Sequence, residues 1–180
     1  MSLLQHEPAI RLLCFASVFA ALALWEIAAP RRHQEIGRAW RWPNNLGVVI
    51  VDSIVLRLIF PTAAVGVAIF AEERGWGFLN LVAFPGWAEI VVAVIVLDLA
   101  IYLQHVLFHA VPAFWRLHRM HHADLEFDVT TGVRFHPVEI VLSMLIKFAV
   151  VAALGAPPLG VLVFEVLLNA TSMFSHGNIR

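Results

Sequence analysis

The sequence predicts an all-α, polytopic integral membrane helical bundle with a cytoplasmic cap rich in histidine. Three observations lead to this fold class: an apolar composition, several apolar runs of membrane-spanning length, and a group of histidines that follows one of these runs. Hydrophobic residues make up 61% of the 180 residues and charged residues 14%, whereas soluble domains carry roughly a quarter charged residues. Lipid is therefore the expected solvent for much of the chain.

Net charge and cysteine content exclude several classes of partner and site. The formal net charge of −1 gives no reason to expect a nucleic acid partner, which would favour a basic surface. Cys14 is the only cysteine, so the chain has neither a disulfide framework nor a thiolate metal site.

Three apolar runs have the length of a spanning helix, which needs about 20 residues. They occupy residues 10–29, 46–70 and 88–110. We expect Pro61 to kink the second run, because proline removes a backbone donor and clashes with the preceding turn. These runs predict three spanning helices.

Two shorter apolar runs follow, at residues 139–154 and 159–174. Gly155-Ala156-Pro157-Pro158 separates them, and such a sequence ends one helix and turns the chain. We expect a short membrane hairpin that either crosses the bilayer or re-enters it. The sequence is thus divided into an N-terminal transmembrane region, residues 1–87, and a histidine-rich region, residues 88–180.

Arginines predict the orientation of these segments. The loop after the first run carries Arg31, Arg32, Arg38 and Arg41, and an excess of Lys and Arg marks cytoplasmic loops. Counting the spans then brings the histidine-rich segment to the same side. We expect a multi-pass membrane protein, in the bacterial inner membrane if the source is prokaryotic.

Five histidines occur within eighteen residues, in the order H-x-x-x-H and H-x-x-H-H: His105, His109, His118, His121 and His122. Residues three or four apart share a helix face, and Pro112 allows a second helix over residues 114–122 to fold back on the first. Neutral imidazole binds iron, zinc, copper and nickel. Five imidazoles exceed the four ligands of tetrahedral zinc, so we predict two metals or an ion of higher coordination number.

Asp98 and two isolated histidines are interpreted separately. Asp98 lies two helical turns before His105, where it either forms hydrogen bonds within the bundle or orients an imidazole. His6 and His33 are interpreted as capping or interfacial residues.

The two histidine motifs, followed by Arg134-Phe135-His136-Pro137-Val138-Glu139 and Phe174-Ser175-His176-Gly177-Asn178, resemble the fatty acid hydroxylase and sterol desaturase superfamily. These are integral-membrane, non-haem di-iron oxygenases. The resemblance implies that the five clustered histidines bind iron and that His136 and His176 lie nearby, as ligands or supporting groups. For His136, capping of a helix that begins at Pro137 is the alternative.

The resemblance also has one gap. The family carries a further H-x-x-H-H motif, and no such motif occurs before Arg180, so five of the eight expected histidines are present. We expect a C-terminally incomplete sequence as the simplest explanation. A second polypeptide that completes the site, or partial replacement by His136 and His176, remains an alternative.

The resemblance implies an oxidoreductase with two non-haem irons that hydroxylates or desaturates a fatty acyl or sterol-like C–H bond with dioxygen, with no catalytic residue beyond the metal ligands. Its partners would be a membrane lipid, dioxygen and a separate cytoplasmic electron donor that is cytochrome b5-, ferredoxin- or reductase-like. The alternatives are an inactive fragment with a partial metal site and a membrane protein that binds haem or another metal through histidine. A transporter would distribute its polar residues along a path, and a zinc hydrolase would show H-E-x-x-H, which is absent.

Overall fold

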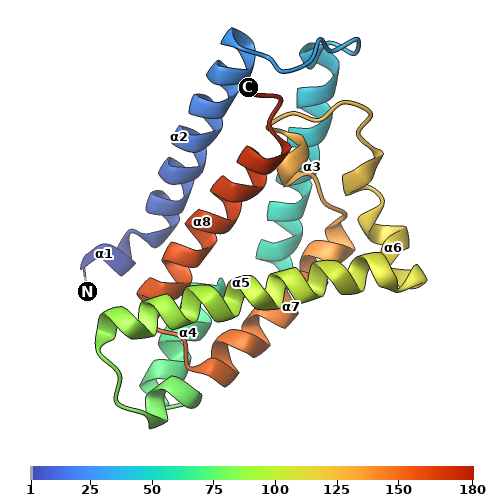
Figure 1. Cartoon of the computed structure of the whole chain (residues 1–180). Coiled ribbons are helices and arrows are strands. Elements are labelled where there is room, and N and C mark those ends of the chain that lie inside the picture. Colours follow the sequence, from blue (N-terminus) through green and yellow to red (C-terminus); the bar gives the residue numbers. More distant parts are fainter. Residues whose placement is uncertain (1) are drawn as a thin grey trace.

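The computed structural model describes residues 2–180, with side chains from residue 4 onward, and over that range its regular structure is helical (Figure 1). One isolated antiparallel bridge joins Pro30 and Ile179. In chain order the elements are α1 (Ser2–Gln5), α2 (Glu7–Ala28), α3 (Arg38–Ile59), α4 (Ala64–Glu73), the 3-10 helix η1 (Phe78–Leu81), α5 (Gly86–Ala110), α6 (Pro112–His118), the 3-10 helices η2 (His121–Ala123) and η3 (Thr131–Val133), α7 (Pro137–Leu154) and α8 (Pro158–His176).

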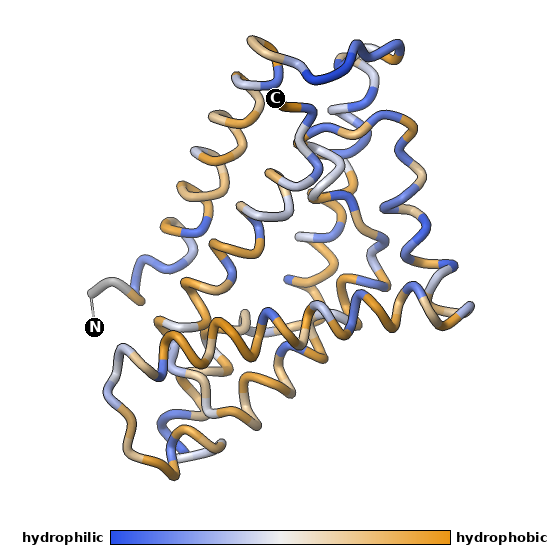
Figure 2. Tube along the Cα trace, viewed as in Figure 1, coloured by the Kyte–Doolittle hydropathy of each residue, from blue (hydrophilic) through white to orange (hydrophobic). Residues whose placement is uncertain are grey.

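Five segments of the described chain are long and apolar enough to cross a membrane: α2, α3 together with α4 and η1, α5, α7 and α8. Figure 2 shows that hydrophobic residues dominate these helices, whereas hydrophilic residues gather in the connection between α2 and α3 and in the segment from α6 to α7. The prediction of an all-α membrane bundle is confirmed. The two helices of the predicted hairpin, with 18 and 19 residues, also qualify by length and composition.

The predicted second span is two helices rather than one kinked helix. α3 ends at Ile59 and α4 begins at Ala64, with Pro61 between them. Phe60 has an extended backbone, φ −110° and ψ 124°, because the ring of a following proline disfavours the α conformation. Pro61 was expected to kink one helix over residues 46–70, and the structure shows that it separates two helices of one candidate span.

Small residues allow the helices to approach closely around the main apolar core. A Cβ atom on Gly160 of α8 would lie 3.0 Å from the Cβ of Ala93 of α5. Small side chains at such interfaces let membrane helices pack backbone to backbone. The buried residues of this core come from α4, α5, α7 and α8 and the turn between the last two: Ala64, Val65, Ala68, Ala93, Leu97, Val151, Ala156, Val161, Leu162 and Phe164.

The turn between α7 and α8 depends on glycine. Gly155 caps α7 in the left-handed conformation, φ 68° and ψ 42°, which glycine adopts without steric cost. A Cβ atom on Gly77 would overlap the backbone of Gly155, so the connection that follows α4 also needs glycine where it passes this turn.

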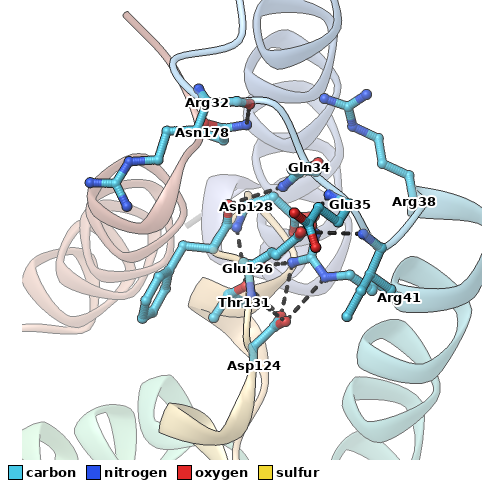
Figure 3. A network of polar contacts seen from close by, with 12 residues as sticks. Arg32, Gln34, Glu35, Arg38, Arg41, Asp124, Glu126, Asp128, Thr131 and Asn178 are labelled. Carbon is cyan, nitrogen blue, oxygen red and sulfur yellow. Dashed lines mark hydrogen bonds and ion pairs between the residues drawn. The ribbon is translucent and has the colours of Figure 1, made fainter.

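A buried polar network holds the loop that follows the histidines, residues 124–130, against the N-terminal helices (Figure 3). Arg41 in the first turn of α3 forms two parallel hydrogen bonds to Asp124, with N···O distances of 3.1 and 3.0 Å, and Arg41 Nη1 lies 2.8 Å from Asp128 Oδ2. Burial raises the pKa of Asp124, but hydrogen bonds from Thr131 and Asn45 and the charge of Arg41 together hold it below its ordinary value. Asp124 therefore binds Arg41 as a carboxylate.

Glu26 joins three distant parts of the chain. It lies fully buried near the end of α2, and its Oε1 accepts hydrogen bonds from the backbone N–H groups of Val129 and Asn178, each 2.7 Å. The loop that contains Arg31 and Arg32 thus lies beside the histidine-rich segment, as the predicted orientation requires. That this face is cytoplasmic remains a prediction.

Candidate metal centre

Helix α5 delivers His105 and His109 to the end of a candidate span. They are one turn apart, and the distance between their Nε2 atoms is 3.1 Å. α5 ends at Ala110 because Pro112 follows Val111, whose backbone is extended (φ −96°, ψ 119°). Pro112 then starts α6, where its missing N–H is not needed. The break redirects the chain so that the next histidines return toward His105 and His109.

The second motif lies on two short elements instead of the single helix predicted over residues 114–122. α6 ends at His118, whereas His121 and His122 belong to the 3-10 helix η2. Loss of the continuous helix does not separate the side chains, because Nε2 of His122 lies 3.2 Å from Nε2 of both His118 and His109.

Four imidazoles converge on one point. The candidate ligand atoms of His105, His109, His118 and His122 all lie within 4.8 Å of one another. Imidazole nitrogens bind an ion such as zinc at about 2.0–2.1 Å, so ligands on opposite sides of one ion lie roughly 4 Å apart. The observed spread is close to that value. These residues are called the four-histidine group below.

His121 and His176 form a second group, the histidine pair, at the end of α8. Their Nε2 atoms are 3.0 Å apart, although 55 residues separate them in the chain. Phe135 stacks on the ring of His121 with a centroid distance of 4.6 Å. The pair adjoins the four-histidine group, because the rings of His121 and His122 are 5.1 Å apart between centroids.

Three of these imidazoles donate a hydrogen bond from Nδ1–H to an acceptor in the surrounding protein. The pairs are His118 to Oε1 of Glu139 (2.7 Å), His121 to the carbonyl oxygen of Arg134 (3.1 Å) and His176 to the carbonyl oxygen of Ser172 (2.8 Å). Such bonds fix the tautomer and direct the lone pair of Nε2 away from the acceptor. Nε2 of each ring is therefore oriented so that it can act as a metal ligand.

The facing lone pairs of the histidine pair fit a bound cation. With Nδ1 of both rings protonated, His121 and His176 direct two Nε2 acceptors at each other across 3.0 Å. A shared proton is disfavoured, because burial and then the nearby His176 lower the pKa of His121 to about 3. Burial, followed by His118 and His109, also lowers the pKa of His122. Neutral imidazoles this close together have the donor chemistry that a transition-metal ion requires.

His136, which was predicted to lie at the site, and Asp98, for which a role at the site was one of two interpretations, are not brought into the cluster. His136 accepts a hydrogen bond at Nδ1 from the backbone N–H of Val138, 3.1 Å, and so caps α7. Among the described residues it has no contact with the other imidazoles, which agrees with the capping alternative. Asp98 is exposed rather than buried, and no hydrogen bond of the described structure joins it to an imidazole. It instead lines the cavity that lies beside the histidines.

Sequence reasoning assigned no role to Glu139, which is 3% exposed and contacts His118. An acidic residue in the first turn of an apolar helix, three residues after His136, is the signal that points to it, because ionisable groups in membrane helices have specific partners. The carbonyl acceptors of Arg134 and Ser172 carry no such signal, since every residue has a carbonyl group.

A cavity of about 530 Å³ extends from the histidines between the helices. His105, His121 and His176 line it at one end, and residues of α2, α3, α5, α7 and α8 form its walls. Its volume falls within the usual range for ligand sites, roughly 300–1,000 Å³. The arrangement joins a cluster of potential metal ligands to a cavity of ligand-binding size.

Comparison with known proteins agrees with this geometry. The family model described as fatty acid hydroxylase matches residues 90–180, half of the chain, which include every histidine of both groups. No curated protein and no solved structure gives a match. With the histidine cluster at the end of an apolar helix, this match shows that the chain belongs to the fatty acid hydroxylase family.

Proposed function

We propose that this protein is a membrane-bound non-haem iron oxygenase that hydroxylates or desaturates a C–H bond of a lipid with dioxygen. The observation that carries the proposal is the convergence of four imidazole ligands within 4.8 Å at the end of a candidate span. Family membership supports lipid hydroxylation as the chemistry. Imidazole-rich sites suit iron, and bound iron supplies the activation of dioxygen that C–H oxidation needs.

The four-histidine group would hold one iron and the histidine pair would contribute to a second. Glu139 and the carbonyl groups of Arg134 and Ser172 would keep the imidazoles correctly oriented by accepting hydrogen bonds from their Nδ1–H groups. Such supporting groups raise the basicity of a ligand and fix its direction. Phe135, stacked on His121, excludes water from that side of the site.

The cavity would hold the substrate with a C–H bond beside His105 and His121. The substrate is a lipid, because the cavity walls belong to helices that are candidate membrane spans. The proposal includes a separate soluble electron donor that is cytochrome b5-, ferredoxin- or reductase-like, because histidine side chains do not supply the electrons that the reaction consumes. It also places the histidines on the cytoplasmic side, in line with the arginine distribution.

A second candidate function, a metal-binding membrane protein without oxygenase activity, has one observation in its favour. The histidine pair offers only two imidazoles among the described residues, whereas the four-histidine group offers four. A haem protein has less support, because four imidazoles converging on one point exceed the one or two axial ligands of a haem iron.

The test is metal content and oxygen incorporation in the full chain purified in detergent. We expect stoichiometric iron by mass spectrometry, no haem absorption band, and transfer of isotopically labelled oxygen into membrane lipids when a reductant is supplied. Iron without labelled product would favour the second candidate. Absence of iron with another metal bound would contradict the oxygenase, and absence of any metal from protein expressed in metal-supplied cells would contradict both.

His118→Ala is the informative variant and His33→Ala the matched control. His118 is 1% exposed within the cluster, whereas His33 is exposed in the loop after α2. We expect His118→Ala to lose iron and labelled product while His33→Ala retains both. Equal iron content in the two variants would contradict the assignment of the site.

A further inference from the structure

The cavity has a charged end far from the histidines. Lys147 of α7 donates a hydrogen bond of 2.8 Å to Oε1 of Glu165 in α8, and Nη1 of Arg11 in α2 lies 3.2 Å from Oε2 of the same carboxylate. Arg11 also donates to Oε1 of Glu7 at 2.9 Å. Arg11, Lys147 and Glu165 all line the cavity, and these three residues are called the charged end below.

The charged end and the metal-binding cluster are separated along the same helices. Glu165 precedes His176 by eleven residues in α8, which corresponds to about 16 Å at roughly 1.5 Å per residue. Lys147 follows Glu139 by eight residues in α7, which corresponds to about 12 Å. A ligand that touches both ends of the cavity must therefore span about 12–16 Å.

Charged groups at this position require an explanation beyond helix stability. Three different candidate spans contribute to the charged end, and ionisable residues inside membrane helices are costly and typically serve a function. Their ion pairs leave donors unused: Arg11 has five N–H groups and Lys147 has three, yet the hydrogen bonds of the described structure involve Nη1 of Arg11 and one acceptor for Lys147. The Arg11 side chain is 31% exposed and that of Lys147 is 11% exposed, and both residues line the cavity.

The balance of acidic and basic side chains at the charged end indicates which class of ligand can bind there. Glu7 and Glu165 neutralise Arg11 and Lys147, so the cluster has no excess positive charge to compensate a carboxylate brought into the membrane. The N–H donors that remain unpaired can bind an oxygen acceptor that carries no charge. A hydroxyl, ketone or ester oxygen has this property, whereas an alkyl terminus offers no acceptor.

We propose that the charged end is a recognition site for a neutral oxygen atom of the lipid substrate, which positions that oxygen about 12–16 Å from the carbon presented to the metal centre. This inference rests on the proposed oxygenase function for the identity of the other end. It makes the substrate a lipid with two points of recognition, one polar atom held by Arg11 and Lys147 and one C–H bond held beside His105 and His121.

A purely structural role is the competing explanation, in which the ion pairs only join α2, α7 and α8. The two roles differ in ligand preference. We would measure binding of isotope-labelled 2-hexadecanone and hexadecane to the purified full chain in lipid nanodiscs, since the ketone adds an acceptor to a chain of equal carbon number. An added hydrogen bond to a charged donor is worth about tenfold in affinity or more, so we expect the wild type to prefer the ketone by at least that factor.

Variants of Arg11 and Lys147 test whether the preference for the ketone arises at the charged end. Lys147→Met and Arg11→Met should reduce the ketone-to-alkane preference about tenfold, whereas Lys147→Arg, which keeps the donors, should retain it. Arg57→Met is the matched control, because Arg57 also lies within a candidate span but is exposed and does not line the cavity. Iron content and thermal unfolding report whether each variant is folded.

The proposal is overturned if wild type shows no preference, or if folded Lys147→Met and Arg11→Met keep the wild-type preference. If one Met variant does not fold, the ratio measured with the other Met variant decides. Because binding is measured without turnover, loss of oxygenase activity with intact ketone preference would contradict the proposed function and leave the recognition site in place.

Discussion

The four-histidine group and the histidine pair are built in different ways. His105, His109, His118 and His122 come from a short stretch with helix breaks before Pro112 and after His118, whereas His121 meets His176 only because α8 returns to the same end of the bundle. Local helix geometry brings the first group together, and tertiary packing brings the second together. We therefore expect the four-histidine group to tolerate disturbance of distant helices better than the histidine pair does.

Removal of one histidine from each group is the strongest test of this comparison. We expect His122→Ala to abolish iron retention, because Nε2 of His122 lies 3.2 Å from that of both His109 and His118. His176→Ala should leave the four-histidine group able to hold iron and so reduce the iron content only in part. Iron per chain by mass spectrometry gives the answer, and an equal loss in both variants would mean that the groups form one cooperative site.

Arg41→Ala tests the dependence of the histidine pair on distant contacts. The change leaves the buried carboxylates of Asp124 and Asp128 without their cation, and removal of one partner of a buried ion pair costs about 3–5 kcal/mol. We expect a lower thermal unfolding temperature in detergent and weaker iron retention. Arg57→Ala, an exposed arginine in the same helix, should leave both unchanged; a similar effect of the two changes would argue against the network.

Glu139→Gln should have a smaller effect that is confined to the four-histidine group. The amide keeps the size of the side chain but weakens the acceptor for Nδ1–H of His118. Loss of a supporting group of this kind lowers metal affinity about 10–100-fold. Competition with a chelator measures the change, and Ser143→Ala, which alters another polar contact of α7, is the control. Unaltered chelator sensitivity in Glu139→Gln would show that His118 is oriented by other means.

Asp98→Asn should change iron retention least. Asp98 is exposed and has no hydrogen bond to an imidazole in the described structure, and exposed substitutions of this kind usually alter stability by less than about 0.5 kcal/mol. The same chelator competition provides the measurement. A clear loss of iron would restore the interpretation of Asp98 as a group that orients an imidazole.

Much of the fold and of the first histidine group followed from sequence patterns. The length of the apolar runs predicted α5 and α8, because no helix break interrupts them. The same criterion failed at Pro61, where an apolar run contains a helix break. Histidine spacing predicted the four-histidine group even though α6 is shorter than expected, because a 3-10 turn keeps His122 close to His118. Local spacing is enough when the ligands are neighbours.

Contacts between distant segments were beyond this reasoning. His136 and His176 both lie next to helix ends and have similar signals in the sequence, yet only His176 reaches another imidazole. The partnership of Arg41 with Asp124 and that of Lys147 with Glu165 depend on how the helices pack. The sign of a charge restricts which residues can form an ion pair, but it does not identify the partner, because the chain contains several acidic and several basic residues.

The hydrogen bonds of Glu26 have a consequence for biogenesis. One carboxylate oxygen binds backbone groups 103 and 152 residues further along the chain. During synthesis, almost all of the described chain must therefore be made before the buried carboxylate of Glu26 in α2 has both partners. His176 ends α8 and Asn178 follows it, so the histidine pair is complete only after α8 has been inserted, and we expect it to assemble later than the four-histidine group.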